Sequence, residues 1–112
     1  MELYGLKNCD KCRAAMKALD NAGIAYVFHD IREASLSTDD LSRWIDATGL
    51  DAIANKRSTT WRALPDAQKA LLEKDAASLL LSHRTLIKRP VIVLGKDVSV
   101  GWTDKIAQKV IK

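Results

Sequence analysis

The pattern of apolar and polar positions changes twice near the start of the chain. Residues 2–5 form a short apolar stretch that ends at Gly5 and predicts a strand. From Asp10 the apolar positions recur at helical spacing until Gly23, which is a natural C-terminal stop. The face expected to be buried carries Cys12, Ala15, Met16, Leu19 and Ala22. Residues 24–28 are β-branched and aromatic, so the opening is predicted to be β-α-β.

The middle of the chain is predicted to be mostly helical. Ser37 and Asp40 have the spacing of a capping box, and the helix that they begin is expected to end at Gly49. Its inward positions would be Leu41, Trp44 and Ile45. Residues 50–54 form a short apolar piece, and residues 55–61 have no period and are expected to be a loop.

Two further helices are expected before the last part of the chain. Pro65 suits the first turn of one, and residues 76–81 predict the other. The inward positions of the first would be Ala67, Ala70 and Leu71. Both helices extend the helical block in the middle of the chain.

The end of the chain is predicted to be β-β-α. Residues 91–94 are a continuous apolar run typical of a buried strand, and residues 98–100 would return as its hairpin partner. Thr103 could cap a final helix. The side chains expected to face inward on this helix are Ile106, Ala107, Val110 and Ile111.

These elements predict an α/β fold with a four-stranded mixed sheet on the thioredoxin-like plan. The whole chain, 1–112, would be one domain, in which 1–30 and 86–112 supply the sheet. Residues 31–85 would be a mostly helical insertion, because a segment of this length is too long for a simple connection.

Composition limits the classes of function. The chain is 47% hydrophobic and 29% charged, as in globular proteins, and no apolar run approaches the ~18 residues of a membrane span. The N-terminus lacks the pattern of a secretory signal, so a cytoplasmic location is expected. The net charge of +4 is modest, and nucleic-acid binding is not predicted from it.

The two cysteines, Cys9 and Cys12, form one C-x-x-C motif where the first strand passes into the first helix. A helix N-terminus favours negative charge, and Lys7 and Lys11 add nearby cations, so both effects favour a Cys9 thiolate. Cys12 lies on the apolar face and should be less exposed. Cys9 would attack the substrate, and Cys12 could resolve the mixed disulfide that results.

Other interpretations of the cysteines compete with this one. A structural zinc site needs about four ligands, and His29 and His83 do not have the spacing of a zinc finger, so no metal site is predicted. Inert packing is a competing interpretation of Cys12 in particular, because unpaired cysteines are often buried.

Four motifs, in order along nearly the whole chain, resemble those of the arsenate-reductase-like (ArsC) family. Within that family the chain is most similar to the small YffB-type members, and Spx is a more distant relative. The motifs are Tyr4-Gly5-Leu6-Lys7-Asn8-Cys9-Asp10, Tyr26-x-Phe28-x-Asp30, Asn55-Lys56-Arg57-Ser58-Thr59-Thr60-Trp61-Arg62 and Ile87-Lys88-Arg89-Pro90. The resemblance implies a thioredoxin-like sheet with a helical insertion.

The resemblance also implies roles for individual residues. Cys9 falls on the family's catalytic cysteine, whereas Cys12 is not a family requirement. Arg89 matches the arginine before a cis-proline, which is Pro90, and is expected to assist Cys9. Arg57, with Lys56 as the alternative, approximates a further anion-binding arginine. The expected substrate or glutathione ligands are Lys7, Asn8, Arg57 and Pro90.

One departure from the family bears on the substrate. Arsenate reductases of this type carry a third arginine after the last strands, where this chain has Val100-Gly101-Trp102-Thr103. Losing one charge-assisted donor weakens oxyanion binding by ~1.5–3 kcal/mol. The resemblance therefore implies a glutathione-dependent thiol reductase, with glutathione as co-substrate and no tightly bound cofactor.

Two alternatives stay open at this point. One is an arsenate reductase coupled to glutathione and glutaredoxin. The other is a redox-sensing regulator that, like Spx, binds RNA polymerase, because Spx also has a C-x-x-C motif. A small disulfide or oxyanion is the expected substrate of the enzymatic alternatives.

Overall fold

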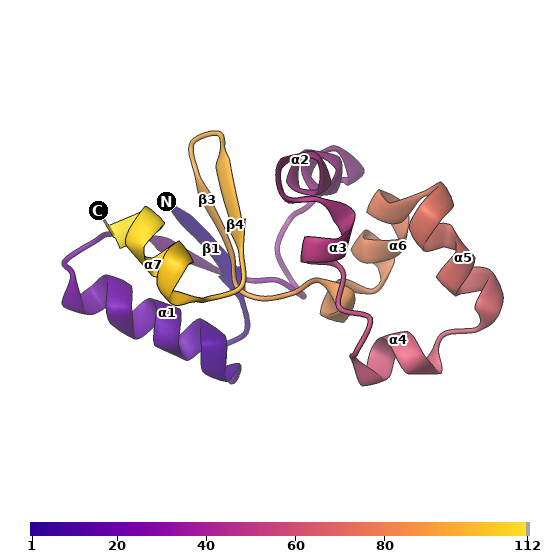
Figure 1. Ribbon diagram of the computed structural model, residues 1–112, viewed down its shortest axis with the longest axis horizontal. Helices are drawn as coiled ribbons and strands as arrows, with labels where there is room; N and C mark the ends of the chain where they lie inside the picture. Colours follow the sequence, from indigo (N-terminus) through magenta and orange to yellow (C-terminus); the bar gives the residue numbers. More distant parts are fainter. Residues whose placement is uncertain (112) are drawn as a thin grey trace. The chain divides into compact units, whose positions relative to one another are not determined.

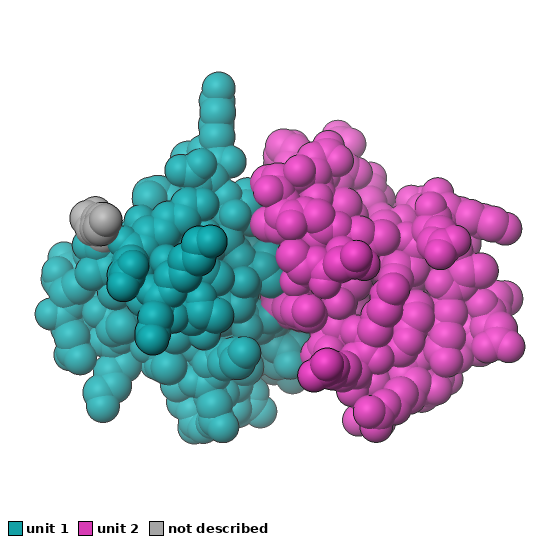
Figure 2. Space-filling model, in the orientation of Figure 1, with its two compact units in different colours: residues 1–34, 89–112 teal, residues 35–88 magenta. Residues whose placement is uncertain are grey.

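The computed structural model describes residues 1–111, and the chain forms two compact units (Figures 1 and 2). Unit 1 combines Met1–Ala34 with the chain from Arg89 onward, and unit 2 is Ser35–Lys88. The sequence analysis placed the corresponding divisions after residues 30 and 85. Within residues 1–111, no helix has both the length and the apolar character to cross a membrane.

Unit 1 is built on one four-stranded sheet with the order β2-β1-β3-β4. Strand β1 runs parallel to β2 and antiparallel to β3, and β3 pairs with β4 as an antiparallel hairpin. The strands are β1 (Glu2–Gly5), β2 (Val27–Asp30), β3 (Val91–Leu94) and β4 (Asp97–Val100). The predicted mixed sheet is therefore confirmed.

Helices α1 (Asp10–Asn21) and α7 (Asp104–Ile111) pack against the sheet of unit 1 (Figure 1). Their contact with it forms a core of Leu3, Ala15, Leu19, Ile92 and Val110. The predicted inward face of α1 is buried at Cys12, Ala15 and Leu19, whereas Ala22 lies beyond the helix end and is exposed. Thr103 caps α7 as predicted, since its Oγ1 accepts from the backbone N–H of Ile106 at 3.2 Å.

Strand β2 begins later than the sequence analysis predicted. Ile24 follows the end of α1 and is still hydrogen-bonded to that helix, because its N–H donates to the carbonyl of Leu19 at 3.0 Å. Pairing with the start of β1 begins only at Val27, whose N–H donates to the carbonyl of Met1 at 3.0 Å. Ile24 and Tyr26 pack against the core of unit 1 from the connecting loop.

Unit 2 is helical, as predicted, but two of its segments differ from the prediction. The apolar piece at residues 50–54 is a short helix, and the predicted loop contains another, begun by Ser58, whose Oγ accepts from the N–H of Trp61 at 3.1 Å. The helices are α2 (Thr38–Thr48), α3 (Leu50–Ile53), α4 (Thr59–Ala63), α5 (Asp66–Lys74), α6 (Ala76–Ser82) and the 3₁₀ turn η1 (Arg84–Leu86).

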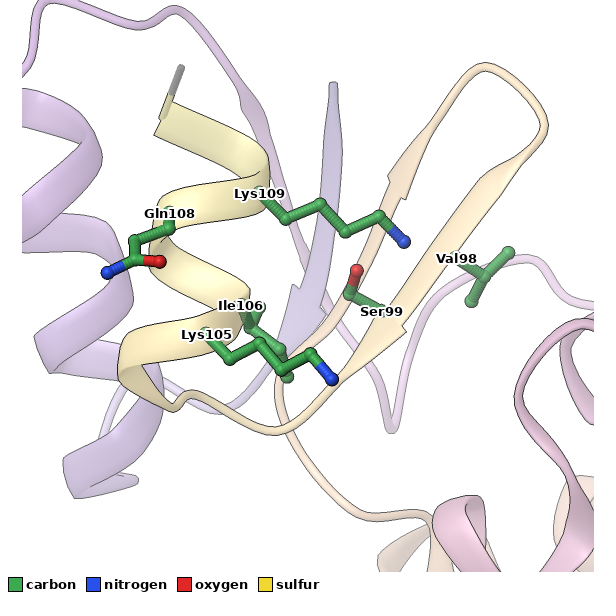
Figure 3. Close-up of a pocket in the computed structure, with 6 residues that line it drawn as sticks. All are labelled: Val98, Ser99, Lys105, Ile106, Gln108 and Lys109. Atoms are coloured by element: carbon green, nitrogen blue, oxygen red, sulfur yellow. The ribbon is translucent and has the colours of Figure 1, made fainter.

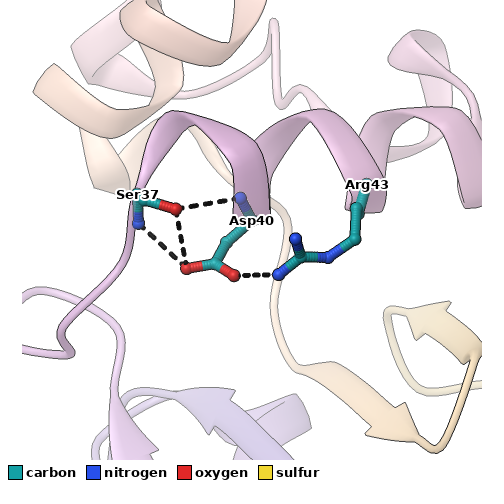
Figure 4. Close-up of polar contacts among 3 residues, drawn as sticks. All are labelled: Ser37, Asp40 and Arg43. Carbon is teal, nitrogen blue, oxygen red and sulfur yellow. Dashed lines mark hydrogen bonds and ion pairs between the residues drawn. The ribbon is translucent and has the colours of Figure 1, made fainter.

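Helix α2 begins with the predicted capping box (Figure 4). The Oγ of Ser37 accepts from the N–H of Asp40 at 3.2 Å, and the Ser37 N–H donates to Oδ2 of Asp40 at 2.9 Å. The Ser37 N–H is the main cause of a lowered pKa of the Asp40 carboxyl, which also pairs with Arg43. The helix buries Leu41 and Trp44 and ends at Gly49.

The inward face of α5 was predicted incorrectly. Ala67 and Ala70 are exposed, Leu71 is half-buried, and the fully buried residue is Leu72. An alanine gains little from burial, so the larger leucine sets which face of a short helix turns inward. Pro65 precedes the helix as its N-cap instead of lying in its first turn.

The sheet order, with helices α1 and α7 packed against it, confirms the α/β thioredoxin-like fold. The C-terminal end of β1 and the N-terminal end of β3 lie at the same end of this sheet, because the two strands are antiparallel. This end of the sheet carries the C-x-x-C motif and the Arg89–Pro90 segment.

Candidate active site

Cys9 occupies the N-cap position of α1. Its backbone is extended, with φ −89° and ψ 126°, and its carbonyl accepts the N–H of Arg13 at 2.9 Å. The Cys9 N–H in turn donates to the carbonyl of Leu6 at 3.1 Å, which closes the turn between β1 and α1. The thiol is partly exposed. As the N-cap residue, Cys9 places it beside the backbone N–H groups that have no partner within the helix.

The surroundings of Cys9 lower the pKa of its thiol. Partial burial acts in the opposite direction, but it is outweighed by hydrogen bonding of the sulfur to the backbone and thiol of Cys12, the side chain of Arg89 and the backbone of Lys11. The side chain of Cys9 accepts no helix-capping hydrogen bond of standard geometry from the backbone N–H groups at the start of α1. The thiolate is thus stabilised by several donors at once, which is the condition for a reactive cysteine.

Cys12 has the opposite character. Its side chain is 0% exposed, and burial raises the pKa of its thiol to about 11, with Cys9 adding to the rise and the backbone of Leu6 opposing it. Cys12 therefore carries its proton at neutral pH and can donate it toward Cys9. The two thiols are reduced and unequal.

Gly5 makes room for Cys12, a role that the sequence analysis did not assign. A Cβ built on Gly5 would lie 2.5 Å from Sγ of Cys12, which is closer than real Cβ atoms come. Only a glycine at the end of β1 lets the sulfur seat there. The signal in the sequence was the glycine at the end of a predicted strand, where such residues often mark a close approach.

Arg89 and Pro90 lie at the same end of the sheet as the two cysteines. The Arg89–Pro90 peptide bond is cis, as the resemblance implied. Pro90 is buried, and its carbonyl accepts the N–H of Gly101 at 2.9 Å, which extends the pairing of β3 with β4 by one position. The side chain of Arg89 contributes to the stabilisation of the Cys9 thiolate.

The turn before Cys9 presents Lys7 and Asn8, which are both exposed. The ammonium of Lys7 lies 5.8 Å from the ring centroid of Phe28, at cation–π distance. The pKa of the Cys9 thiol is lowered by backbone groups, the Cys12 thiol and Arg89, and the predicted support from the ammonium groups of Lys7 and Lys11 stays a prediction. A role for Lys7 and Asn8 in binding a ligand stays a prediction.

Arg57 lies in unit 2. It is exposed, and its N–H donates to Oδ1 of Asn55 at 3.1 Å. The loop is held at Asn55, whose N–H donates to the carbonyl of Leu86 at 2.7 Å. The predicted anion-binding role of Arg57 stays a prediction.

The histidine near the sheet edge packs against other side chains. His29 stacks on Tyr4 with ring centroids 4.6 Å apart, and its Nε2 lies 3.3 Å from a carboxylate oxygen of Glu2. Within residues 1–111, no group of three or more His, Cys, Asp or Glu side chains is arranged to hold a metal ion.

A thioredoxin-like sheet, a cysteine at the N-cap of its first helix and a cis-proline at its third strand define the class as a thioredoxin-like protein with a thiol site. Within that class, the chain belongs to the ArsC family, whose pattern it matches over residues 4–110. It is similar to an uncharacterized protein of Haemophilus influenzae, with 39% identity over 92% of this chain and 91% of the relative. It is also similar to the global transcriptional regulator Spx of Bacillus subtilis, with 29% identity over 91% of this chain and 79% of that protein.

Solved structures agree with this assignment. A YffB protein superposes with a TM-score of 0.90 and 37% identity, covering 99% of this chain and 98% of the other. An arsenate reductase (ArsC) related protein from Brucella melitensis gives a TM-score of 0.74 and 29% identity, covering 99% and 93% of the two chains. The resemblance inferred from the four sequence motifs is therefore confirmed at the level of the family.

Proposed function

We propose that the protein is a thiol–disulfide oxidoreductase that uses glutathione as its reductant. Membership of the ArsC family supports oxidoreductase chemistry in general. The observation that carries the proposal is the contrast between a Cys9 thiol of lowered pKa and a buried Cys12 thiol with a pKa of about 11. Such an arrangement provides one nucleophile and one proton donor at the same site.

The first step is attack of the Cys9 thiolate on a mixed disulfide between glutathione and a second thiol. A bond forms between Sγ of Cys9 and the glutathione sulfur, and the original S–S bond breaks. The second thiol leaves with the electron pair of that bond and takes a proton from solvent or from Cys12. Arg89, with the helix N–H groups, stabilises negative charge on Cys9 before attack and when it leaves in the next step.

The second step can follow two routes. A second glutathione thiolate can attack the mixed disulfide, which releases oxidised glutathione and restores Cys9. Alternatively, Cys12 can attack Sγ of Cys9, which releases glutathione and leaves a Cys9–Cys12 disulfide for two glutathiones to reduce. The two routes have the same overall stoichiometry and differ only in the need for Cys12.

The test uses the mixed disulfide of glutathione and hydroxyethanethiol, with formation of oxidised glutathione as the readout. Cys9→Ser should lose at least about a hundredfold in kcat/KM, because an alcohol does not replace a thiolate nucleophile. Cys12→Ser separates the routes, since retained turnover indicates the glutathione route and lost turnover the Cys12 route. An active Cys9→Ser protein would refute the proposal.

Glutathione itself is expected to bind at the turn before Cys9. Lys7 and Asn8 are exposed there, and an ammonium and an amide suit the carboxylates and peptide groups of the tripeptide. Lys7→Gln should raise KM for glutathione about threefold with little change in kcat, in keeping with one exposed ion pair. Lys17→Gln on the exposed face of α1 is the matched control.

Arsenate reduction coupled to glutathione and glutaredoxin is a second candidate. It is favoured by the 29% identity to the arsenate reductase related protein from Brucella melitensis and by Arg89 beside Cys9. The segment Val100-Gly101-Trp102-Thr103 offers no cation for an oxyanion. Lack of turnover at millimolar arsenate with both co-reactants would eliminate this candidate.

A redox-sensing regulator is a third candidate from a different class. The 29% identity to the global transcriptional regulator Spx and the contact between Cys9 and Cys12 favour it. Reversible disulfide formation without catalytic turnover, together with capture of RNA polymerase by only one redox form, would support it. Equal capture by the reduced and oxidised forms would contradict it.

A further inference from the structure

A groove lies between strand β4 and helix α7 of unit 1, apart from the residues assigned to the Cys9 site (Figure 3). Its volume is about 650 Å³. The residues that line this β4–α7 groove are Val98 and Ser99 from the strand and Lys105, Ile106, Gln108 and Lys109 from the helix. The proposed thiol chemistry uses none of them.

Strand β4 is the last strand of the sheet, so it has an outer edge with no strand beside it within residues 1–111. The bond from the Gly101 N–H to the Pro90 carbonyl fixes which residues point outward. Bonded and non-bonded pairs alternate along an antiparallel ladder, so Ser99 bonds back to β3. Val98 and Val100 therefore direct their N–H and C=O groups to the outer edge.

Two lysine side chains of α7 lie beside the outer edge of β4. Lys105 and Lys109 are one helical turn apart, and Figure 3 shows both side chains extending from α7 toward β4. Neither forms an ion pair with any carboxylate in the part of the chain that the structure describes. Between them and the strand lies Ser99, 7% exposed, whose hydroxyl can donate to an anion in the groove.

The spacing of the two lysines matches that of alternate side chains on a strand. Four residues of α-helix rise about 6 Å. Two residues of β-strand rise about 6.8 Å. A strand added along β4 would thus present two carboxylates, separated by one residue, to Lys105 and Lys109 in turn.

We propose that the β4–α7 groove binds an extended acidic peptide segment of a protein partner, which pairs with the outer edge of β4 and places two alternating carboxylates against Lys105 and Lys109. The backbone groups of Val98 and Val100 supply the pairing, as in other cases of strand addition. A small anion would use only the lysines and the Ser99 hydroxyl and would leave these backbone groups to water, so a strand-adding peptide uses more of the polar groups of the groove.

The probe is a short, cysteine-free, fluorescein-labelled peptide of alternating valine and aspartate, measured by fluorescence anisotropy with the full chain. It should bind the protein, and the double variant Lys105→Gln/Lys109→Gln should weaken binding roughly fivefold, as two partly exposed ion pairs would. The double variant Lys17→Gln/Lys74→Gln removes the same charge from exposed positions elsewhere and should bind like the unchanged protein.

A second peptide of the same sequence, with N-methyl groups on the backbone nitrogens that would face β4, keeps the charge and removes strand pairing. It should bind at least tenfold more weakly. Equal binding of the two peptides, displacement by inorganic phosphate beyond the effect of chloride at the same ionic strength, or no binding of the first peptide would each overturn the proposal.

Discussion

Cys9 and Cys12 are the same residue type three positions apart, yet their surroundings give them opposite chemistry. Cys9 lies at the N-cap of α1 with N–H donors and Arg89 around it, and the pKa of its thiol is lowered. Cys12 lies one turn further along, fully buried, with a pKa of about 11. The difference teaches that the position along the helix, more than the motif itself, decides which thiol has the lowered pKa.

The largest effect expected from this contrast is in alkylation rates. At pH 7 iodoacetamide should modify Cys9 about a thousandfold faster than Cys12, because Cys12 combines complete burial with a negligible thiolate fraction. Peptide mass spectrometry of the reduced native protein measures both rates in one sample. In denaturant the rates should become similar, and similar rates in the native protein would contradict the assignment.

The stability of the reduced protein should depend on the titration of Cys12. The pKa of the Cys12 thiol is about 11 in the folded protein, against an ordinary value of 9.0. The protonated thiol therefore makes its full contribution to the free energy of unfolding below pH 9, and this contribution is lost as the pH rises through 11. The total loss is about 3 kcal/mol. Urea unfolding across this range measures it, and Cys12→Ala should remove this part of the slope while leaving the contributions of lysines and tyrosines.

The close packing of Cys12 against Gly5 can be tested by a substitution at Gly5. Gly5→Ala should lower the free energy of unfolding by about 2 kcal/mol, because the new Cβ would meet Sγ of Cys12 at 2.5 Å. The double variant Gly5→Ala/Cys12→Ala should recover part of this loss relative to the sum of the single variants. Strictly additive effects would mean that the two side chains do not compete for the same space.

The lowered pKa of the Cys9 thiol depends in part on Arg89. Arg89→Met should move the pH midpoint of Cys9 alkylation upward and lower the rate at pH 7 about three- to tenfold, because a donor to the thiolate is lost. Arg89→Lys keeps the charge and should show a smaller change. Unchanged pH profiles in both variants would assign the lowered pKa to the helix N–H groups alone.

Much of the fold follows from patterns that the sequence states clearly. The capping box at Ser37 and Asp40, the stop at Gly49 and the final hairpin each rest on a local signal, and each is present. The prediction was wrong where a tertiary contact decides. Val27 starts β2 because it reaches the carbonyl of Met1, a partner distant in sequence.

The candidate site was predictable in its residues but less so in its physics. Cys9 and the cis-proline at Pro90 followed from motifs. Support for the Cys9 thiolate from the helix N-terminus and from Arg89 was also expected, but the hydrogen bond from the Cys12 thiol was not. The seat of Cys12 against Gly5 depends on a distance between two elements, which no spacing along the chain reveals.

The close fit between Gly5 and Cys12 also limits what oxidants can do to the protein. Peroxides convert a thiolate successively to sulfenic, sulfinic and sulfonic acids, and each stage adds an oxygen atom around the sulfur. The sulfur of Cys12 is fully buried and lies against Gly5, so we expect its oxidation to be limited to a bond with Cys9. Irreversible damage should therefore fall on Cys9, and a bond to Cys12 would be the form in which Cys9 survives oxidative stress.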